Sequence, residues 1–181
     1  MAKAAAAFAV GLLLSACSSV LQSGAPIGSS PTQVAMVSSP IVGVSPTAPP
    51  GAQLVAGGGC GDSPVYHGAI PPWASVNAPA DLNYVIANPD LAMGYLFSYP
   101  LKAGPDSNKI LWYVRAPRGG QALDGQGHPV GASQPTVSFT QGDNSGPGEI
   151  YPSGVTAPSP GCWHFHITWN GYAADVDLLF H

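Results

Sequence analysis

Apolar and polar side chains alternate most regularly at the end of the chain. Residues 163–169 and 172–178 each have an apolar side chain at every second position, and Asn170-Gly171 separates them. Both central residues of a type I′ turn need positive φ, which Asn tolerates and Gly adopts freely. The pattern therefore predicts a β-hairpin in which Trp169 faces Tyr172. One face of this hairpin is apolar and consists of Trp163, Phe165, Ile167, Trp169, Tyr172, Ala174, Val176 and Leu178.

The other face of the predicted hairpin is polar. The same register sets His166 opposite Asp175 and His164 opposite Asp177, with Cβ atoms roughly 4.5–5.5 Å apart in each pair. Alternation alone predicts a polar outer face, and cross-strand His–Asp pairs would help to fix the register. Imidazole and carboxylate are also ligands of Zn²⁺ and Cu²⁺. We favour the solvent-facing surface and keep a metal site at these four residues as the alternative.

The remaining pattern predicts further strands and no helix. Pro and Gly interrupt the chain often, and no apolar period of 3.6 residues is sustained. Short strand-like segments recur at residues 63–70, 82–87, 93–99, 109–115, 134–140 and 149–156. Seven or eight short strands joined by turns indicate an all-β fold, an antiparallel β-sandwich. Residues 124–128 and 142–146 combine Asp with Gly or Asn, and we expect both to form loops.

The chain before this domain has a different composition. Between Lys3 and Asp62 there is no charged residue, and Ser, Pro, Gly, Ala and Val predominate from Ser18 to Gly59 without any aromatic side chain. Such a segment cannot bury enough apolar surface to fold. We therefore expect a disordered linker over residues 17–59 and a folded domain over residues 60–181.

The first residues resemble an export signal. Lys3 precedes a short apolar segment, which is too short to span a bilayer. The segment ends in Leu14-Ser15-Ala16-Cys17, which resembles the lipobox of bacterial lipoproteins at every position. The resemblance implies that residues 1–16 are a cleaved signal peptide. It also implies that Cys17 carries a diacylglyceryl group and a fatty acyl chain (palmitate). An ordinary signal peptide with a coincidental Cys17 is the alternative.

Three motifs in the second half of the chain resemble the immunoglobulin-like domains of uncharacterised bacterial lipoproteins. They are Asn108-Lys109-Ile110-Leu111-Trp112, Ile150-Tyr151-Pro152 and Pro160-Gly161-Cys162-Trp163. The resemblance covers roughly the last 75 residues. It implies an immunoglobulin-like sandwich and carries little information about function, because sandwiches have many unrelated roles.

Two cysteines remain once Cys17 is assigned to lipid. Cys60 and Cys162 form an even pair in a compartment that we expect to be oxidising, so we predict a disulfide between them. Closing a loop of about 100 residues would stabilise the domain by roughly 4–5 kcal/mol in the chain-entropy model. Two free thiols are one alternative, and metal ligation together with His164 and His166 is another.

The sequence contains no motif that indicates an enzyme. It has no Gly-x-Ser-x-Gly, no His-Glu-x-x-His and no phosphate-binding glycine loop. The net charge of −4 gives no basic surface for nucleic acid. We expect Arg115 and Arg118 to be surface charges near a strand end. Trp73 and Tyr151 are the candidate contact residues for a partner.

These observations predict a non-enzymatic binding or structural domain, attached by lipid to the extracytoplasmic face of the cell membrane or outer membrane. The partner would be the membrane itself, together with an unidentified envelope protein or glycan. No cofactor is expected beyond the lipid on Cys17. The alternative function is an extracytoplasmic metal-binding protein that uses the His and Asp side chains of the hairpin.

Overall fold

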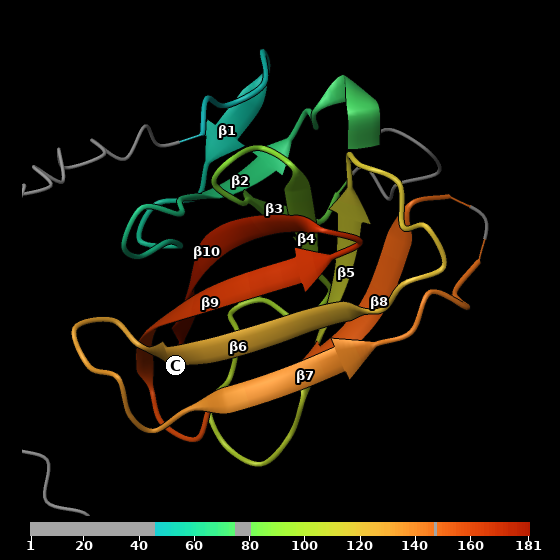
Figure 1. The fold of residues 1–181 in the computed structure, drawn as a ribbon. Helices are drawn as coiled ribbons and strands as arrows, with labels where there is room; N and C mark the ends of the chain where they lie inside the picture. Colours follow the sequence, from blue (N-terminus) through green and yellow to red (C-terminus); the bar gives the residue numbers. More distant parts are fainter. Residues whose placement is uncertain (1–45, 75–80, 147) are drawn as a thin grey trace, which may run out of the picture. The chain divides into compact units, whose positions relative to one another are not determined.

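The computed structural model describes residues 46–74, 81–146 and 148–181. Its strands form two antiparallel sheets, and Figure 1 shows β10, β9, β6 and β7 together in one layer. The predicted lipid-modified Cys17, the signal peptide and most of the predicted linker lie outside the described residues. A 3₁₀ turn, η1 (Pro72–Ala74), follows the second strand.

The first sheet has six strands in the order β1-β2-β3-β4-β5-β8. Their bounds are β1 Ala52–Leu54, β2 Val65–Gly68, β3 Asn83–Ile86, β4 Ala92–Leu96, β5 Asn108–Val114 and β8 Ile150–Val155. The second sheet has the order β10-β9-β6-β7. Its strands are β6 Leu123–Pro129, β7 Val137–Gln141, β9 Gly161–Trp169 and β10 Tyr172–Phe180. The prediction of an all-β antiparallel sandwich is confirmed.

Two strands were not expected from the sequence. Strand β1 pairs with β2 although it precedes Cys60, so the folded part of the chain begins before the expected boundary at residue 60. Strand β6 occupies residues 124–128, which we expected to form a loop. The other eight strands correspond to the predicted segments. Over the described residues, the sandwich therefore has ten strands in place of seven or eight.

Strand β6 was missed because two of its inward positions, Gly125 and Gly127, are glycines. A Cβ atom at Gly125 would lie 2.2 Å from the Phe139 ring, and one at Gly127 would lie 2.5 Å from the Phe165 ring. The aromatic rings of the neighbouring strands thus fill the space over both glycines. Asp124-Gly125-Gln126-Gly127 therefore does not form a turn in this strand. Its two glycines make room for aromatic rings from the neighbouring strands.

The main core lies between the sheets. The six-stranded sheet contributes Trp112 and Tyr151, and the four-stranded sheet contributes Trp163, Phe165 and Trp169, all of them buried. Buried indole and phenol groups need hydrogen-bond partners. Trp112 Nε1 donates to Ser153 Oγ at 2.9 Å, and the Tyr151 hydroxyl donates to the Gln121 carbonyl at 2.9 Å. The expectation that Tyr151 contacts a partner at the surface is therefore wrong.

The terminal hairpin has the predicted register. Asn170 and Gly171 both have positive φ, at 42° and 79°, and Trp169 pairs with Tyr172. Seven of the eight side chains assigned to its apolar face are buried. The exception is Tyr172, which is 40% exposed and stacks on Trp169 with ring centroids 5.9 Å apart. Tyr172 is next to the turn, where it lies on the edge of the core.

The six-stranded sheet is buried on its other face as well. Tyr66, Tyr84, Tyr95 and Tyr113 form a buried row there, with successive ring centroids 5.6, 6.2 and 5.6 Å apart. Burial, and to a lesser extent the neighbouring phenols, raise the pKa of Tyr84 and of Tyr95 to about 12. The Tyr84 hydroxyl donates to the Ala69 carbonyl. The Tyr95 hydroxyl is buried and has no hydrogen-bond partner in the described chain.

We predict that the protein loses stability as the pH rises above 10. The phenols of Tyr84 and Tyr95 have a higher pKa in the folded protein than in the unfolded chain, so their ionisation favours unfolding. The stabilisation from keeping these phenols neutral is complete below pH 10 and declines toward about pH 12. Tyr95→Phe should reduce this decline, and near neutral pH it should cost nothing because its hydroxyl is unpaired. Urea unfolding at several pH values measures both effects. Exposed Tyr172→Phe is the control, and an equal change in this control would contradict the prediction.

We also predict that Gly127→Ala destabilises the domain by about 1–3 kcal/mol, because the added Cβ would displace the buried Phe165 ring. Gly142→Ala is the matched control, since its nearest neighbour would be at an ordinary contact distance of 3.4 Å. Equilibrium unfolding in urea provides the comparison. Equal stabilities of the two variants would argue against the role of Gly127 in aromatic packing.

Candidate functional site

The outward face of the four-stranded sheet carries the predicted polar side chains. His166 pairs with Asp175 and His164 pairs with Asp177 across β9 and β10, which confirms the predicted register. The side chains of His164, His166 and Asp175 are 35%, 53% and 46% exposed, whereas that of Asp177 is only 11% exposed. The four residues thus share one face but differ in their access to solvent.

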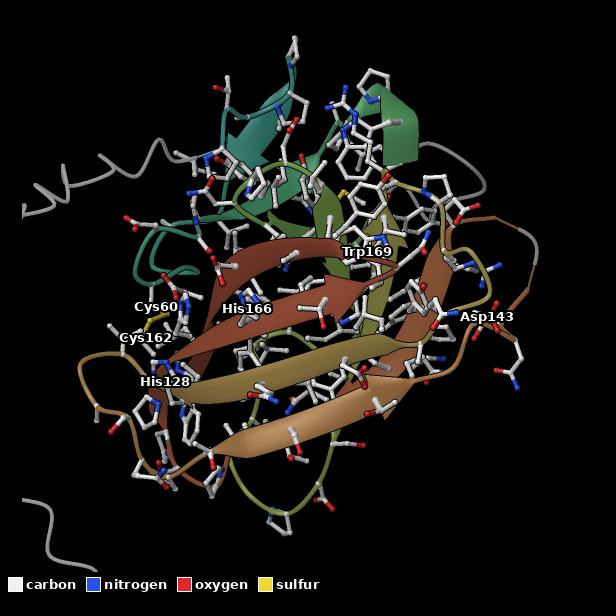
Figure 2. All side chains as sticks on the ribbon, in the orientation of Figure 1. Cys60, His128, Asp143, Cys162, His166 and Trp169 are labelled. Carbon is white, nitrogen blue, oxygen red and sulfur yellow. A yellow bond between two sulfur atoms is a disulfide. The ribbon has the colours of Figure 1, made fainter. Side chains whose placement is uncertain are left out.

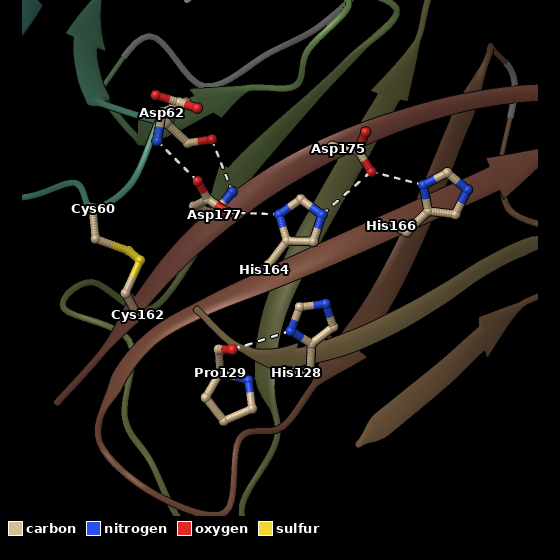
Figure 3. A network of polar contacts seen from close by, with 10 residues as sticks. Cys60, Asp62, His128, Pro129, Cys162, His164, His166, Asp175 and Asp177 are labelled. Atoms are coloured by element: carbon tan, nitrogen blue, oxygen red, sulfur yellow. Dashed lines mark hydrogen bonds and ion pairs between the residues drawn. A yellow bond between two sulfur atoms is a disulfide. The ribbon is translucent and has the colours of Figure 1, made fainter. Parts of the chain in front are cut away.

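The four side chains form a chain of contacts, shown in Figure 3. His166 Nδ1 lies 2.7 Å from Asp175 Oδ1, and His164 Nδ1 lies 2.8 Å from Asp177 Oδ1. His164 Nε2 lies 3.5 Å from the same Asp175 oxygen. An ionised carboxylate only accepts hydrogen bonds, so each Nδ1 carries the proton that it donates. The carboxylates therefore fix the orientation of both imidazole rings.

Asp177 also binds the segment that enters the domain. The backbone N–H of Asp62 donates to Asp177 Oδ2 at 2.8 Å, and the N–H of Asp177 donates to Ser63 Oγ at 2.8 Å. Gly61 has a φ of +54°, and a Cβ atom there would lie 2.0 Å from Asp177 Oδ2. Glycine is therefore required at position 61, both by its backbone conformation and by the close carboxylate.

The predicted disulfide joins the same segment to β9. Cys60 and Cys162 are bonded at an S–S distance of 2.05 Å and are 102 residues apart in the sequence. Figure 2 shows this bond at one end of the four-stranded sheet, close to His128. Pairing excludes the alternatives in which these two cysteines are free thiols or metal ligands. The bridge and Asp177 together hold residues 60–63 against the terminal hairpin.

His128 belongs to this surface, although the sequence did not indicate it. It lies in β6 directly opposite His164, and the two ring centroids are 5.4 Å apart. His128 Nδ1 lies 3.0 Å from the carbonyl oxygen of Pro129. A signal was present, because Leu123, Gly125 and Gly127 alternate with polar residues if the glycines are counted as inward positions.

These histidines line an open groove with a volume of about 560 Å³. Strands β6 and β9 form its floor, and β7 with the residues before it forms one side. Its lining consists of Gln126, Gly127, His128, Thr136, Val137, Ser138, His164, His166 and Asp175. The groove therefore presents imidazole, amide, hydroxyl and carboxylate groups to one ligand.

The alternative metal site at His164, His166, Asp175 and Asp177 is not assembled. Among the residues that the structure describes, no three His, Cys, Asp or Glu side chains are grouped so that they could hold an ion. The carboxylates instead contact the ring nitrogens directly. In this arrangement the four residues form an ion-pair and hydrogen-bond network.

The two candidate arginines differ from each other. Arg115 is exposed, as expected, and lies 3.3 Å from Asp90. The Arg118 side chain is only 15% exposed and donates to the carbonyls of Asp143, Ser145 and Ile150. Arg118 is therefore a partly buried anchor for the loop at 142–146, and not the freely exposed surface charge that we expected.

Trp73 lies in η1 and is half-buried. It lines a second, less polar groove of about 510 Å³ together with Ile86, Asp90, Arg115 and six residues of Pro-rich segments. Trp73 is thus still available to a partner, whereas Tyr151 is not.

Comparison of the chain with protein-family models, curated proteins and solved structures finds no match. Within the described ranges, no helix has the length and apolar character needed to cross a membrane. The function must therefore be argued from the sequence motifs and from the geometry of the groove.

We predict that Asp177→Asn costs about 1–3 kcal/mol of stability. The Asp62 N–H and the His164 Nδ1–H are accepted by different oxygens of Asp177, and the substitution turns one of these oxygens into an NH₂ group that faces a donor. Asp175→Asn should cost less, because Asp175 is half-exposed and its ion pairs are solvent-screened. Urea unfolding with the disulfide intact measures both variants. If the Asp175 variant lost as much stability as the Asp177 variant, the buried contacts of Asp177 would have no special importance.

Proposed function

We propose that this chain is a lipid-anchored protein of the cell envelope that displays a non-enzymatic β-sandwich for binding. The observation that carries the proposal is Leu14-Ser15-Ala16-Cys17 directly after a short apolar segment. In this proposal, Cys17 becomes the lipid-modified first residue of the mature protein. Two or more acyl chains give stable attachment, since each buried methylene contributes about 0.8 kcal/mol.

The disulfide supports an extracytoplasmic location. Disulfides persist in oxidising compartments and are rare in the cytosol, where thiols are kept reduced. The Cys60–Cys162 bond closes a loop that includes most of the domain. This bond and the lipobox are independent features, and both indicate the outer side of the cell membrane.

The groove on the four-stranded sheet supports binding as the role of the domain. A solvent-facing sheet surface needs only polar side chains, but here the histidines are held by carboxylates and a carbonyl and line a concave space. The carboxylates of Asp177 and Asp175 hold the Nδ1 atoms of His164 and His166 and so fix both rings at the groove. The partner is an envelope protein, a glycan or another polar ligand that enters this groove.

We predict that Cys17→Ala removes fatty-acid labelling and releases the protein from washed membranes. The reason is that the sulfur of Cys17 is the proposed point of diacylglyceryl attachment. Membrane fractionation and metabolic labelling with an alkyne fatty acid measure the two effects. The labelling result is decisive, because an uncleaved signal peptide also retains a protein at the membrane.

The double variant Cys60→Ser with Cys162→Ser is the matched control for this experiment. It removes the other two cysteines and the disulfide but leaves Cys17 in place, so its labelling should match that of the natural chain. Unchanged labelling of Cys17→Ala would refute the anchor.

A further inference from the structure

We infer that the outward face of the four-stranded sheet binds a neutral oligosaccharide. The binding surface combines the groove lined by the histidines with a smaller groove at the turn of the terminal hairpin. The ligand lies along β6 and β9, where side-chain hydrogen bonds and the ring of Tyr172 hold it. The inference rests on the proposed binding role of the domain, because it names the class of ligand that this face accepts. It does not depend on the lipid anchor.

The smaller groove has a volume of about 360 Å³ and includes both residues of the hairpin turn. Its lining consists of Gln121, Ala122, Asp124, Thr168, Trp169, Asn170, Gly171, Tyr172 and Ala173. Asp124 pairs with Thr168, and the next outward pair on the same strands, Gln126 with His166, lines the histidine groove. Two residues of a strand span about 7 Å. The two grooves therefore follow one another along the sheet, and Figure 2 shows His128, His166 and Trp169 in succession along it.

The face offers hydrogen-bonding side chains in three cross-strand rows. The first row contains Thr168, Asp124 and Thr140, the second contains Asp175, His166, Gln126 and Ser138, and the third contains His164 and His128. Successive rows are about 7 Å apart, so the three rows cover about 14 Å. Carboxylates accept hydrogen bonds, whereas hydroxyl and amide groups both accept and donate. An oligosaccharide has hydroxyl groups along its whole length, each of them donor and acceptor, and so can bond to all three rows.

The charges on this face favour a neutral ligand. No Lys or Arg side chain belongs to the described lining of either groove, whereas Asp124 and Asp175 do. An anionic ligand would meet like charge without a compensating cation. Both carboxylates are also already held, since Thr140 Oγ1 donates to Asp124 Oδ1 at 2.6 Å and His166 Nδ1 donates to Asp175 Oδ1 at 2.7 Å. We therefore assign them as oriented acceptors for sugar hydroxyls.

Tyr172 supplies an apolar contact at one end of the surface. Its ring is 40% exposed and stacks on buried Trp169, with centroids 5.9 Å apart and planes inclined by 29°. Trp169 thus supports the ring from behind. Hydrogen bonds to sugar hydroxyls replace bonds to water, so they add little net affinity. The C–H face of a sugar ring packs on an aromatic ring and removes apolar area from water, which adds the affinity that hydrogen bonds alone lack.

The position of the grooves favours a sugar over a peptide. Peptides bind sheets by adding a strand to a free edge, and they bind elsewhere through apolar side-chain pockets. Strands β6 and β9 are the two central strands of the sheet and are paired on both sides. Their backbone groups are used within the sheet, so recognition on this face depends on side chains. Polar side chains beside one supported aromatic ring suit a polyhydroxyl ligand.

The test uses the full chain with its disulfide intact, purified in a detergent without a sugar headgroup. The probes are maltohexaose, cellohexaose, mannohexaose and chitohexaose, which are neutral and differ in linkage and stereochemistry. Calorimetric titration should show saturable binding of at least one of them. A hyaluronan hexasaccharide has the same length but carries carboxylates, and it should bind at least about tenfold more weakly than the best neutral probe.

Variants locate the binding surface. Tyr172→Ala and Gln126→Ala should each weaken binding of that probe by at least about fivefold. Tyr172→Phe keeps the aromatic ring and should keep most of the affinity. The matched control is Phe97→Ala, because Phe97 is 39% exposed, follows β4 of the other sheet and lines neither groove. This control should bind the probe as the natural chain does.

Three results would overturn the inference. The first is the absence of saturable binding of all four neutral probes, and the second is unchanged binding in both Tyr172→Ala and Gln126→Ala. The third is tighter binding of hexalysine than of any neutral probe, which would assign the face to a cationic partner. None of them bears on the labelling of Cys17, so the proposed anchor is judged separately. A failure of that labelling would in turn leave sugar binding by the domain unaffected.

Discussion

The rest of this structure depends on the inward side chains of β9, which pack between the two sheets. Trp163, Phe165, Ile167 and Trp169 all point into the core, and each contributes roughly 1.5–3 kcal/mol by its burial. Because side chains alternate with a period of two, a shift of one residue would expose all four to water. The register of β9 is therefore strongly fixed. His164 and His166 face outward as a direct consequence, with no separate cost for placing them.

The entry into the domain is fixed on the same strand pair. The disulfide attaches Cys60 to β9, while the Asp177 carboxylate on β10 binds the backbone of Asp62. Asp177 also orients His164, so one buried carboxylate serves both the fold and the polar surface. The fold and the polar surface are therefore coupled. A change that weakens the contact between Asp177 and the Asp62 backbone would also release the His164 ring.

The sequence predicted those features that depend on local patterns. Alternation and Asn170-Gly171 were sufficient for the hairpin and its His–Asp pairs, and cysteine counting was sufficient for the disulfide. Features that depend on packing between distant segments were missed. Arg118 is partly buried because its guanidinium donates to the carbonyls of three later residues, which no local pattern reveals. Tyr172 remains 40% exposed beside the turn although its cross-strand partner Trp169 is buried, which alternation does not distinguish.

Strand β6 shows why the groove itself could not be predicted. Gly125 and Gly127 indicated a loop, yet they are the positions over which Phe139 and Phe165 pack. Only when these glycines are understood as inward strand positions does His128 become an outward residue next to His164. The feature that concealed the strand is thus the one that lets β6 pair closely with β9 under an aromatic layer. The groove is for this reason a property of the four-stranded sheet and not of the terminal hairpin alone.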